Sequence, residues 1–289
     1  MKAALLGAAL FVAAGACKAE DAQWYLQVDN DVPFGTDRWY TSGVRIARSH
    51  RSEEGRRIEW GLVQEIYTPN TNAYQPNDRP YVARLFFSGA RHDYSPGMHR
   101  TFEATLGVRG PSARGQQAQE FVHRFVPAPE DDWSRQLPDH VDLQFIASQT
   151  QSLALCPRDL CAAHFGASLG TTQAFTHVGF EVRTGNAQHV ESPLLRFAAT
   201  PPIAGHAGWS AFAGASARLV ARNALLEGNA DAGAPDVSLN HGVFRVAAGI
   251  SWAGNWGAVT FGLAQDSREF ETQRGMQRFG TLTVHLAPF

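Results

Sequence analysis

The sequence contains no apolar run long enough to cross a membrane as a helix. A spanning helix needs about 20 consecutive apolar residues. Beyond the N-terminal segment no stretch of the 289 residues approaches that length, although 44% of them are hydrophobic. The sequence also lacks a large excess of either positive or negative charge, because its formal net charge is −2 at pH 7. A nucleic-acid partner is therefore not indicated, since such proteins carry a basic excess.

Residues 1–19 have the form of an export signal: a lysine, an apolar segment and then small residues that suit cleavage. We expect the mature protein to span 20–289 as one domain. Cys17 leaves lipidation open as an alternative, although Ala14 stands where a lipobox usually carries leucine.

Cysteine is scarce, and the two cysteines of the mature chain, Cys156 and Cys161, lie close together in sequence. In an oxidising, exported setting this spacing favours a disulfide. A zinc site is the alternative, but it needs two more ligands and His164 supplies only one. We therefore expect the disulfide.

Apolar and polar residues alternate along many short segments. In 102–109, Phe, Ala, Leu and Val alternate with Glu, Thr, Gly and Arg, and 58–66, 178–183 and 244–252 follow a similar pattern. Strands of about ten residues with an apolar outer face and a polar inner face are typical of a transmembrane β-barrel. A soluble β-sandwich is the alternative, and it is disfavoured because Trp and Phe lie near the ends of the apolar face.

The sequence predicts an all-β fold, a twelve-stranded antiparallel transmembrane β-barrel with one short helix in an extracellular loop. With the N-terminus in the periplasm, the connections after odd-numbered strands lie outside and are mostly long, as in bacterial barrels. The connection 186–207 is a long exception on the periplasmic side. The strands are expected near 23–30, 41–49, 58–68, 82–92, 101–109, 141–154, 161–173, 176–185, 208–222, 242–253, 256–266 and 278–289.

One segment, 107–124, breaks the β pattern. A strand runs into a Gly/Pro break and then into a helical spacing that repeats apolar residues from Ala118 to Phe125 on one stripe. Gln119 and His123 lie four residues apart beside that stripe. A lone histidine on a short helix is more often packed or solvated than catalytic, so the helix needs support from other residues.

Three polar groups converge on the predicted outer rim: Asp29-Asn30-Asp31 with Thr36 to Gly43, Gln64 to Pro69 with Asn77 to Tyr81, and the helix with 132–137. Their motifs are Asn-Asp, Tyr-Thr-x-Gly, Tyr-x-Pro followed by Asp-Arg, and Gly-Gln-x-x-Gln-x-x-x-His. In this order, over nearly the whole mature chain, the sequence resembles the family of outer-membrane lipid A 3′-O-deacylases.

The resemblance implies a calcium-dependent hydrolase that removes the 3′-linked acyloxyacyl group of lipid A. It implies metal binding by Asn30 and Asp31, and catalytic roles for Thr41, Gln119 and His123. A basic pair of the family has no counterpart in 70–75, and a family tyrosine after the helix is replaced around Glu130 and Asp131. The resemblance therefore does not predict phosphate contacts at these two positions in the chain.

The chemistry of the residues agrees with these roles. Ester hydrolysis needs an activated water and a group that stabilises the oxyanion, and histidine is a base suited to neutral pH. Asn30 and Asp31 offer the hard oxygen ligands that Ca²⁺ prefers. The alternatives are structural, because Asn and Asp are common in turns and Thr41 could be an ordinary strand residue.

Arginines near the predicted rim suit the phosphates of lipid A, because guanidinium binds phosphate in a bidentate way. Arg38, Arg79 and Arg124 are the candidates, each of which could equally be a solvated charge. We expect a monomer, integral to the bacterial outer membrane, with lipopolysaccharide as substrate and the active site facing outward.

Two other classes of function stay open. An outer-membrane phospholipase with a serine nucleophile would need a His-x-Ser-x-Gly motif. The nearest string, His92 to Gly97, is one residue too long and falls in a predicted periplasmic turn. A non-enzymatic porin or adhesin is the other alternative.

Overall fold

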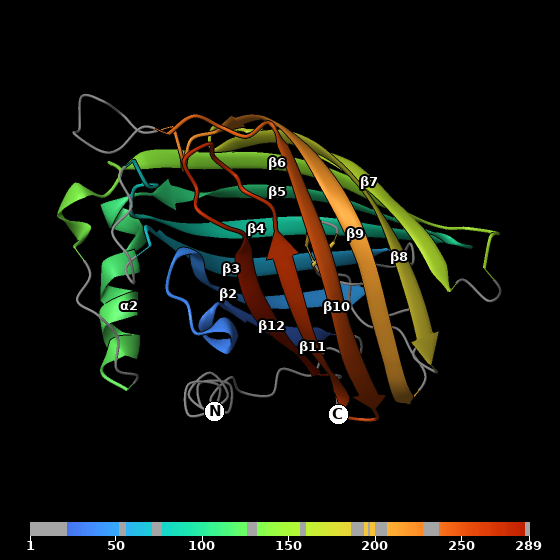
Figure 1. The fold of residues 1–289 in the computed structure, drawn as a ribbon. Coiled ribbons are helices and arrows are strands. Elements are labelled where there is room, and N and C mark those ends of the chain that lie inside the picture. The colour runs from blue at the N-terminus through green and yellow to red at the C-terminus, as the bar shows by residue number, and fades with distance from the viewer. Residues whose placement is uncertain are drawn as a thin grey trace.

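In the computed structural model the strands close into a single barrel, with one α-helix, α2, across one end (Figure 1). The structure describes residues 22–51, 56–70, 77–125, 132–156, 160–185, 194–195, 197–199, 207–227 and 237–286. The expected signal peptide, 1–19, lies outside the described residues. Within the described part of the chain, no helix is both long and apolar enough to cross a membrane.

Each strand pairs antiparallel with its sequence neighbours, and β1 pairs with β12 to close the ring. The twelve expected strands are confirmed, with ends that shift by up to three residues. Their bounds are β1 Gln23–Asn30, β2 Trp39–Arg51, β3 Arg57–Thr68, β4 Val82–Ser95, β5 Met98–Arg109, β6 His140–Ser152, β7 Cys161–Gly170, β8 Gln173–Gly185, β9 Gly208–Asn223, β10 Gly242–Gly254, β11 Gly257–Asp266 and β12 Gln277–Leu286.

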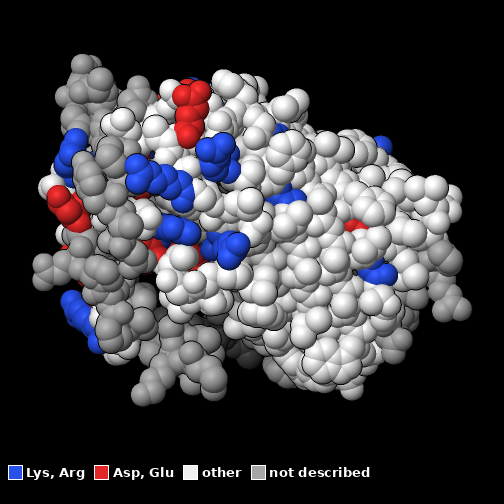
Figure 2. Space-filling model, viewed as in Figure 1, with Lys and Arg blue, Asp and Glu red and all other residues white. Residues whose placement is uncertain are grey.

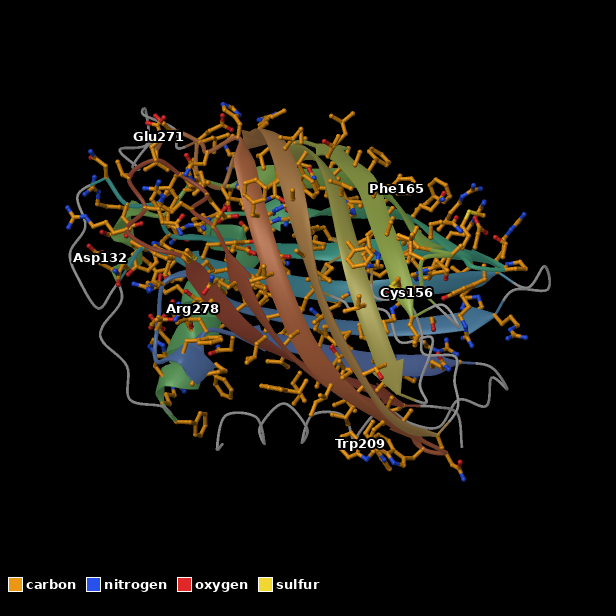
Figure 3. All side chains as sticks on the ribbon, turned by 45° about the vertical axis from the view of Figure 1, so that its right-hand side comes forward. Asp132, Cys156, Phe165, Trp209, Glu271 and Arg278 are labelled. Carbon is orange, nitrogen blue, oxygen red and sulfur yellow. A yellow bond between two sulfur atoms is a disulfide. The ribbon has the colours of Figure 1, made fainter. Side chains whose placement is uncertain are left out.

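The remaining elements lie at one end, which we call the α2 end. They are η2 Val32–Phe34, η3 Pro111–Ala113, α2 Gly115–His123 and η4 Trp133–Arg135. The other end carries the expected disulfide between Cys156 and Cys161, and we call it the disulfide end. Figure 3 shows Asp132 and Arg278 at the α2 end and Cys156 at the opposite end.

The two faces of the barrel wall have opposite polarity, as the alternation predicted. On β5, Leu106 is 61% exposed on the outer face whereas Glu103 is 4% exposed and points into the lumen. Figure 2 shows an outer wall that is largely free of charge, with Lys, Arg, Asp and Glu gathered toward the α2 end. A broad uncharged wall of this kind is the lipid-facing surface of a membrane barrel.

Ion pairs between strands fill the lumen. Buried charges are tolerated when they are paired and hydrogen-bonded. In the lumen, arginine side chains form ion pairs with one or more carboxylates. The pairs are Arg45 with Glu59 at 2.8 Å and Glu103 at 3.0 Å, Arg84 with Asp142 at 2.6 Å and Glu65 at 2.8 Å, and Arg245 with Asp266 at 2.5 Å.

The described residues of the long connection between β8 and β9, 194–195 and 197–199, lie in the lumen. Leu194 and Leu195 are 2% and 0% exposed, and they form one apolar cluster with Phe279 of β12. The backbone carbonyl of Leu194 accepts a hydrogen bond from Arg245 at 2.9 Å, and the backbone N–H of Ala199 donates to Glu103 at 2.8 Å. The described part of this connection is therefore a plug anchored to lumen charges.

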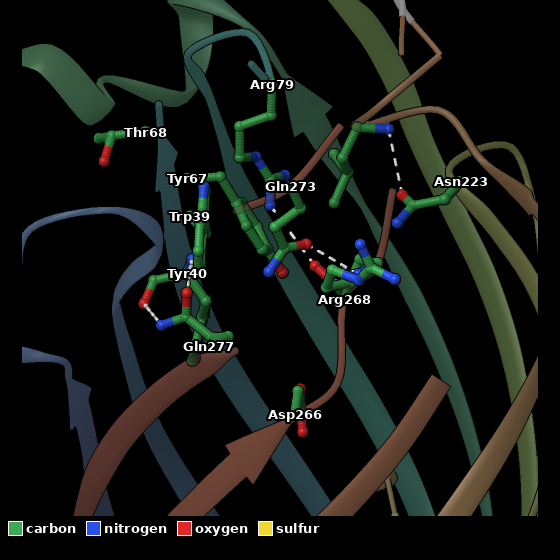
Figure 4. Close-up of polar contacts among 12 residues, drawn as sticks. Trp39, Tyr40, Tyr67, Thr68, Arg79, Asn223, Asp266, Arg268, Gln273 and Gln277 are labelled. Atoms are coloured by element: carbon green, nitrogen blue, oxygen red, sulfur yellow. Dashed lines mark hydrogen bonds and ion pairs between the residues drawn. The ribbon is translucent and has the colours of Figure 1, made fainter. Parts of the chain in front are cut away.

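Loops close the lumen at the α2 end. Trp39, Leu226 and Phe270 are each 0% exposed and form one apolar cluster. Beneath them Arg79 lies over the ring of Tyr67 at 4.4 Å (Figure 4). A cavity of about 210 Å³ remains between these loops and the plug.

Candidate functional site

The helix α2 packs on the outer face of the barrel wall, because a glycine lets it approach. Gly115 begins the helix, and a Cβ at this position would lie 2.3 Å from the Cβ of Ala83 on β4 and 3.0 Å from the ring of Trp133. Arg114, which precedes it, adopts a left-handed conformation with φ 59° that turns the chain into the helix. Only a residue without a side chain fits such an approach.

Gln119 lies one turn farther along α2 and points toward the wall. It is 4% exposed, and its Oε1 accepts a hydrogen bond from the indole N–H of Trp133 at 3.1 Å. Its Nε2 is buried and has no hydrogen-bond partner among the described residues. A buried amide donor of this kind is free to hold a ligand, because leaving it unpaired costs free energy.

His123 is the last residue of α2 and faces the connection between β1 and β2. Its Nε2 lies 3.9 Å from Oδ2 of Asp37 in that connection. Burial raises the pKa of the Asp37 carboxyl, and the nearby imidazole opposes that rise. The helix therefore crosses from β4, where Gly115 docks, to the loop that follows β1.

A β-bulge on β2 turns Thr41 to the outer face. Tyr40 pairs with Tyr67 and Ser42 with Ile66, so Thr41 is the extra residue. Bulges re-aim side chains in this way and are frequent beside active sites. The hydroxyls of Thr41 and Thr68 lie 2.6 Å apart. In Figure 4 Thr68 lies apart from the lumen residue Tyr67, in agreement with an outward position.

Asn30 and Asp31 end β1 beside Thr41. The backbone N–H of Asp31 donates to the carbonyl of Thr41 at 3.3 Å. One carboxylate oxygen of Asp31, Oδ2, accepts hydrogen bonds from the Thr36 hydroxyl and the Arg38 backbone N–H, both at 2.9 Å. The side chain of Asn30 accepts a bond from the backbone of Val32 at 2.7 Å, which holds the turn into η2.

The second oxygen of Asp31 makes this a candidate cation site. Oδ1 is buried and has no hydrogen-bond partner among the described residues, and Asp31 is 1% exposed. Burial, together with the charge of Asp37, raises the pKa of Asp31 to about 8, although the hydrogen bonds from Arg38 and Thr36 oppose the rise. A cation would relieve both effects, because an opposite charge favours the ionised carboxylate.

The donor set is that of a hard cation. Carboxylate, amide and hydroxyl oxygens from Asp31, Asn30 and Thr41 are ligands of the kind that Ca²⁺ takes. No group of three or more His, Cys, Asp or Glu able to hold a metal occurs in the described part of the chain.

The comparisons with known proteins match this architecture. The family model of the outer membrane protein LpxR matches residues 2–287. The chain belongs to the LpxR outer membrane protein family. The expected resemblance, the barrel fold and the outer-membrane location are thus confirmed.

A solved structure supports the fold of this LpxR-family chain. LpxR from Salmonella typhimurium superposes with a TM-score of 0.79 at 20% identity, covering 92% of this chain and 99% of that chain. The translocator domain of the autotransporter NalP from Neisseria meningitidis has a TM-score of 0.45 at 11% identity, covering 99% and 95%. No curated protein sequence matches the chain.

In this LpxR-family barrel Asn30, Asp31 and Thr41 lie together where β1 and β2 meet at the α2 end. Gln119 and His123 lie on α2, whose last residue faces Asp37 of the β1–β2 connection. The structure separates the three arginines. Arg79 is 1% exposed and pairs with Glu269 at 3.6 Å at the mouth of the lumen. The guanidinium of Arg38 lies over the ring of Trp39 at 4.4 Å, whereas Arg124 is exposed at the end of α2.

Three neighbours of the site were not singled out from the sequence as site residues. Asp37 faces His123, Trp133 holds Gln119, and Thr68 contacts Thr41. All three lie in the polar segments that are predicted to converge on the outer rim. Spacing along the chain, however, does not predict which side chains contact one another. Ile66 lies on the outer face as expected, but it does not face lipid, because Tyr81 and Trp133 pack against it.

Proposed function

We propose that this LpxR-family protein hydrolyses the 3′-linked acyloxyacyl ester of lipid A at the outer leaflet, with His123 as general base and Ca²⁺ as cofactor. The α2 end then faces the cell exterior. The products are the released acyloxyacyl fatty acid and a 3′-hydroxyl on lipid A.

The position of the site on the lipid-facing wall carries this proposal. Asn30 pairs with Ser42 at the end of the β1–β2 ladder, and the next outward pairs down the same ladder are Val28 with Val44 and Leu26 with Ile46. Val44 and Ile46 are 37% and 39% exposed. An acyl chain that lies along this apolar track in the membrane brings its ester to the level of Asn30 and Asp31. A soluble substrate would need no such track.

His123 supplies the base. Its imidazole takes a proton from water, the resulting hydroxide attacks the ester carbonyl, and the imidazolium returns the proton to the departing sugar oxygen. Asp37 faces the same imidazole at 3.9 Å and helps to orient it. The Nε2 of Gln119 and the hydroxyl of Thr41 are donors suited to orienting the water or the carbonyl.

Asn30 and Asp31 would hold the calcium ion, because their oxygens are hard ligands and Oδ1 of Asp31 is buried without a described partner. When bound, Ca²⁺ supplies polarisation of the ester carbonyl and stabilises the oxyanion. Arg124, exposed beside His123, is the arginine placed to meet a lipid A phosphate.

The geometry favours this proposal over the two alternatives. The ring of His92 contacts Glu59 at 3.3 Å and His99 at 3.2 Å inside the barrel, so it does not serve Ser95, the last residue of β4. A porin would need an open lumen, whereas Leu194 and Leu195 of the plug are buried within it.

Mass spectrometry of lipid A tests the proposal. Cells that produce the protein should carry lipid A lighter by one acyloxyacyl group, and cells that produce His123→Ala should not. An unchanged lipid A mass in cells with folded wild-type protein would reject the activity.

The orientation has its own test. Ser134 is exposed at the α2 end and Leu155 is 84% exposed at the disulfide end. A cysteine at Ser134 should react with an impermeant maleimide on intact cells, and one at Leu155 only after the outer membrane is permeabilised. The reverse result would turn the site toward the periplasm.

A further inference from the structure

The helix α2 and the turn that follows it carry an apolar stripe that the barrel does not cover. Phe121, Val122 and Phe125 are 48%, 44% and 53% exposed. The rings of Phe121 and Phe125 pack edge to face with centroids 5.4 Å apart, so they form one surface. Large apolar side chains grouped in this way mark a site of interaction with a protein or a membrane.

The stripe is separate from the face that docks on the wall. Gly115 and Gln119 are the buried residues of α2, whereas Phe121 and Phe125 lie on one flank of that buried face by the helical period. Glu120 and Arg124 lie on the other side and are exposed. The helix therefore has three sides: one on the barrel, one apolar and one polar. This is the pattern of an interfacial helix.

The stripe lies near a surface that already meets lipid. In Figure 1 α2 runs across the strand ends rather than along them, so it lies roughly in the plane of the membrane that the barrel spans. It docks beside Ile66 on β3, and Leu62, four residues down the same strand, is 53% exposed on the lipid-facing wall. Four strand residues span about 13 Å. A helix of about 5 Å radius with phenylalanine side chains covers most of that distance.

We propose that Phe121, Val122 and Phe125 insert into the acyl-chain region of the outer leaflet and fix α2 at the membrane surface. The occupant of the apolar stripe is membrane lipid, because the stripe continues the apolar wall of the barrel and the polar side of α2 carries Glu120 and Arg124. The lipid surface then helps to hold His123 and Gln119 over the site. This consequence for catalysis rests on the proposed function, but the insertion itself does not.

Fluorescence quenching tests the insertion without reference to activity. The natural cysteines Cys156 and Cys161 form a disulfide, so single cysteines at Phe121, Phe125 or Glu120 can be labelled with an environment-sensitive fluorophore. The labelled protein is placed in phosphatidylcholine vesicles whose acyl chains carry bromine. We expect quenching at 121 and 125 at least about twofold stronger than at 120, and close to that of a label at Leu106.

Equal quenching at 121 and 120 would overturn the proposal. Shielding of the label at 121 that grows with protein concentration and is accompanied by cross-linking between chains would also overturn it, because the stripe would then cover a second copy. Strong quenching at 121 that is independent of protein concentration supports insertion into lipid.

An activity measurement tests the consequence. The double variant Phe121→Ser, Phe125→Ser should lose about tenfold or more of the wild-type rate on lipid A in vesicles and keep its rate on a short, soluble ester. The matched control, Glu120→Ser, changes an exposed residue on the polar side of α2 and should keep both rates. Equal losses of the double variant on both substrates would mean that the stripe only stabilises α2. A wild-type protein that hydrolyses neither substrate would reject the proposed function and leave the quenching result standing.

Discussion

The lumen and the outer wall of this barrel hold similar polar residues in opposite states. In the lumen, carboxylates such as Glu59, Glu103 and Asp142 each have an arginine within 3.0 Å. At the outer wall, Asp31 is as deeply buried, yet it has only a hydroxyl and a backbone N–H on one oxygen and no described partner on the other. Arginines neutralise the carboxylates of the lumen, whereas Asp31 has no described cationic partner, and this difference is the reason why we propose a cation beside Asp31.

The two regions also differ in how tightly they are filled. The plug and the loops at the α2 end occupy the lumen with apolar side chains such as Leu195 and Trp39, both 0% exposed. The outer-wall site instead lies under a single short helix that touches the wall through Gly115 and Gln119. The barrel is therefore a scaffold, and the candidate site lies on its outer surface at one end.

Exchange of Asp31 should have the largest effect on hydrolysis. Asp31→Asn removes the charge that would hold Ca²⁺, so the rate of acyl release should fall by about 10³-fold, since a Lewis acid stabilises the transition state by several kcal/mol. Asp29 is the matched control: it points into the lumen and accepts a hydrogen bond from Tyr40 at 2.8 Å. Asp29→Asn should keep most activity. Equal losses in the two variants would erase the distinction between wall and lumen.

Removal of the base should come next in size. His123→Ala should lower the hydrolysis rate by at least about 10²-fold, in the range of general-base catalysis. His140, an exposed histidine at the start of β6, is the control, and His140→Ala should act as wild type. The heat-dependent shift of a folded barrel in gel electrophoresis checks both proteins. A folded His123→Ala variant that stays active would remove this histidine from the mechanism.

A shift of α2 without change of its chemistry should have a smaller effect. Gly115→Ala places a Cβ 2.3 Å from Ala83, so the helix must move, and we expect a loss of about tenfold because misplaced catalytic groups lose rate steeply. Ala83→Gly in the same chain should restore part of the rate. Failure of the second change to help would show that the close approach to β4 does not position the site.

Changes in the plug should have the smallest effect. Leu194→Ala with Phe197→Ala loosens the packing in the lumen but leaves the outer wall intact, so hydrolysis should stay close to the wild-type rate. The wild-type protein should conduct no ions in planar bilayers. A loss of hydrolysis in the plug variant as large as that of His123→Ala would place the site in or through the lumen.

Period-two alternation was enough to predict the strands and their faces, because the bilayer and the packed lumen impose opposite polarity on successive residues. Leu106 and Glu103 show this most plainly. The plug was not predictable in the same way. Leu194 and Ala199 make tertiary hydrogen bonds with Arg245 and Glu103. No local sequence pattern predicts that a loop folds back into the barrel.

The sequence predicts candidate site residues, but it does not predict the tertiary contacts among them. Asn30, Asp31, Thr41, Gln119 and His123 lie in segments with recognisable motifs. The contact between His123 and Asp37, however, depends on where α2 crosses the wall, which Gly115 and Trp133 decide through packing. Ile66 is covered because α2 and Trp133 dock on the wall there. From the sequence alone, Ile66 is predicted to be an ordinary lipid-facing residue.

The most direct measurement follows acyl release by the purified protein in lipid A vesicles while calcium is removed and returned. We expect that excess EGTA stops the reaction and that added Ca²⁺ restores it in the wild-type protein but not in Asp31→Asn. Release that continues unchanged in excess EGTA would contradict a cation at the outer wall.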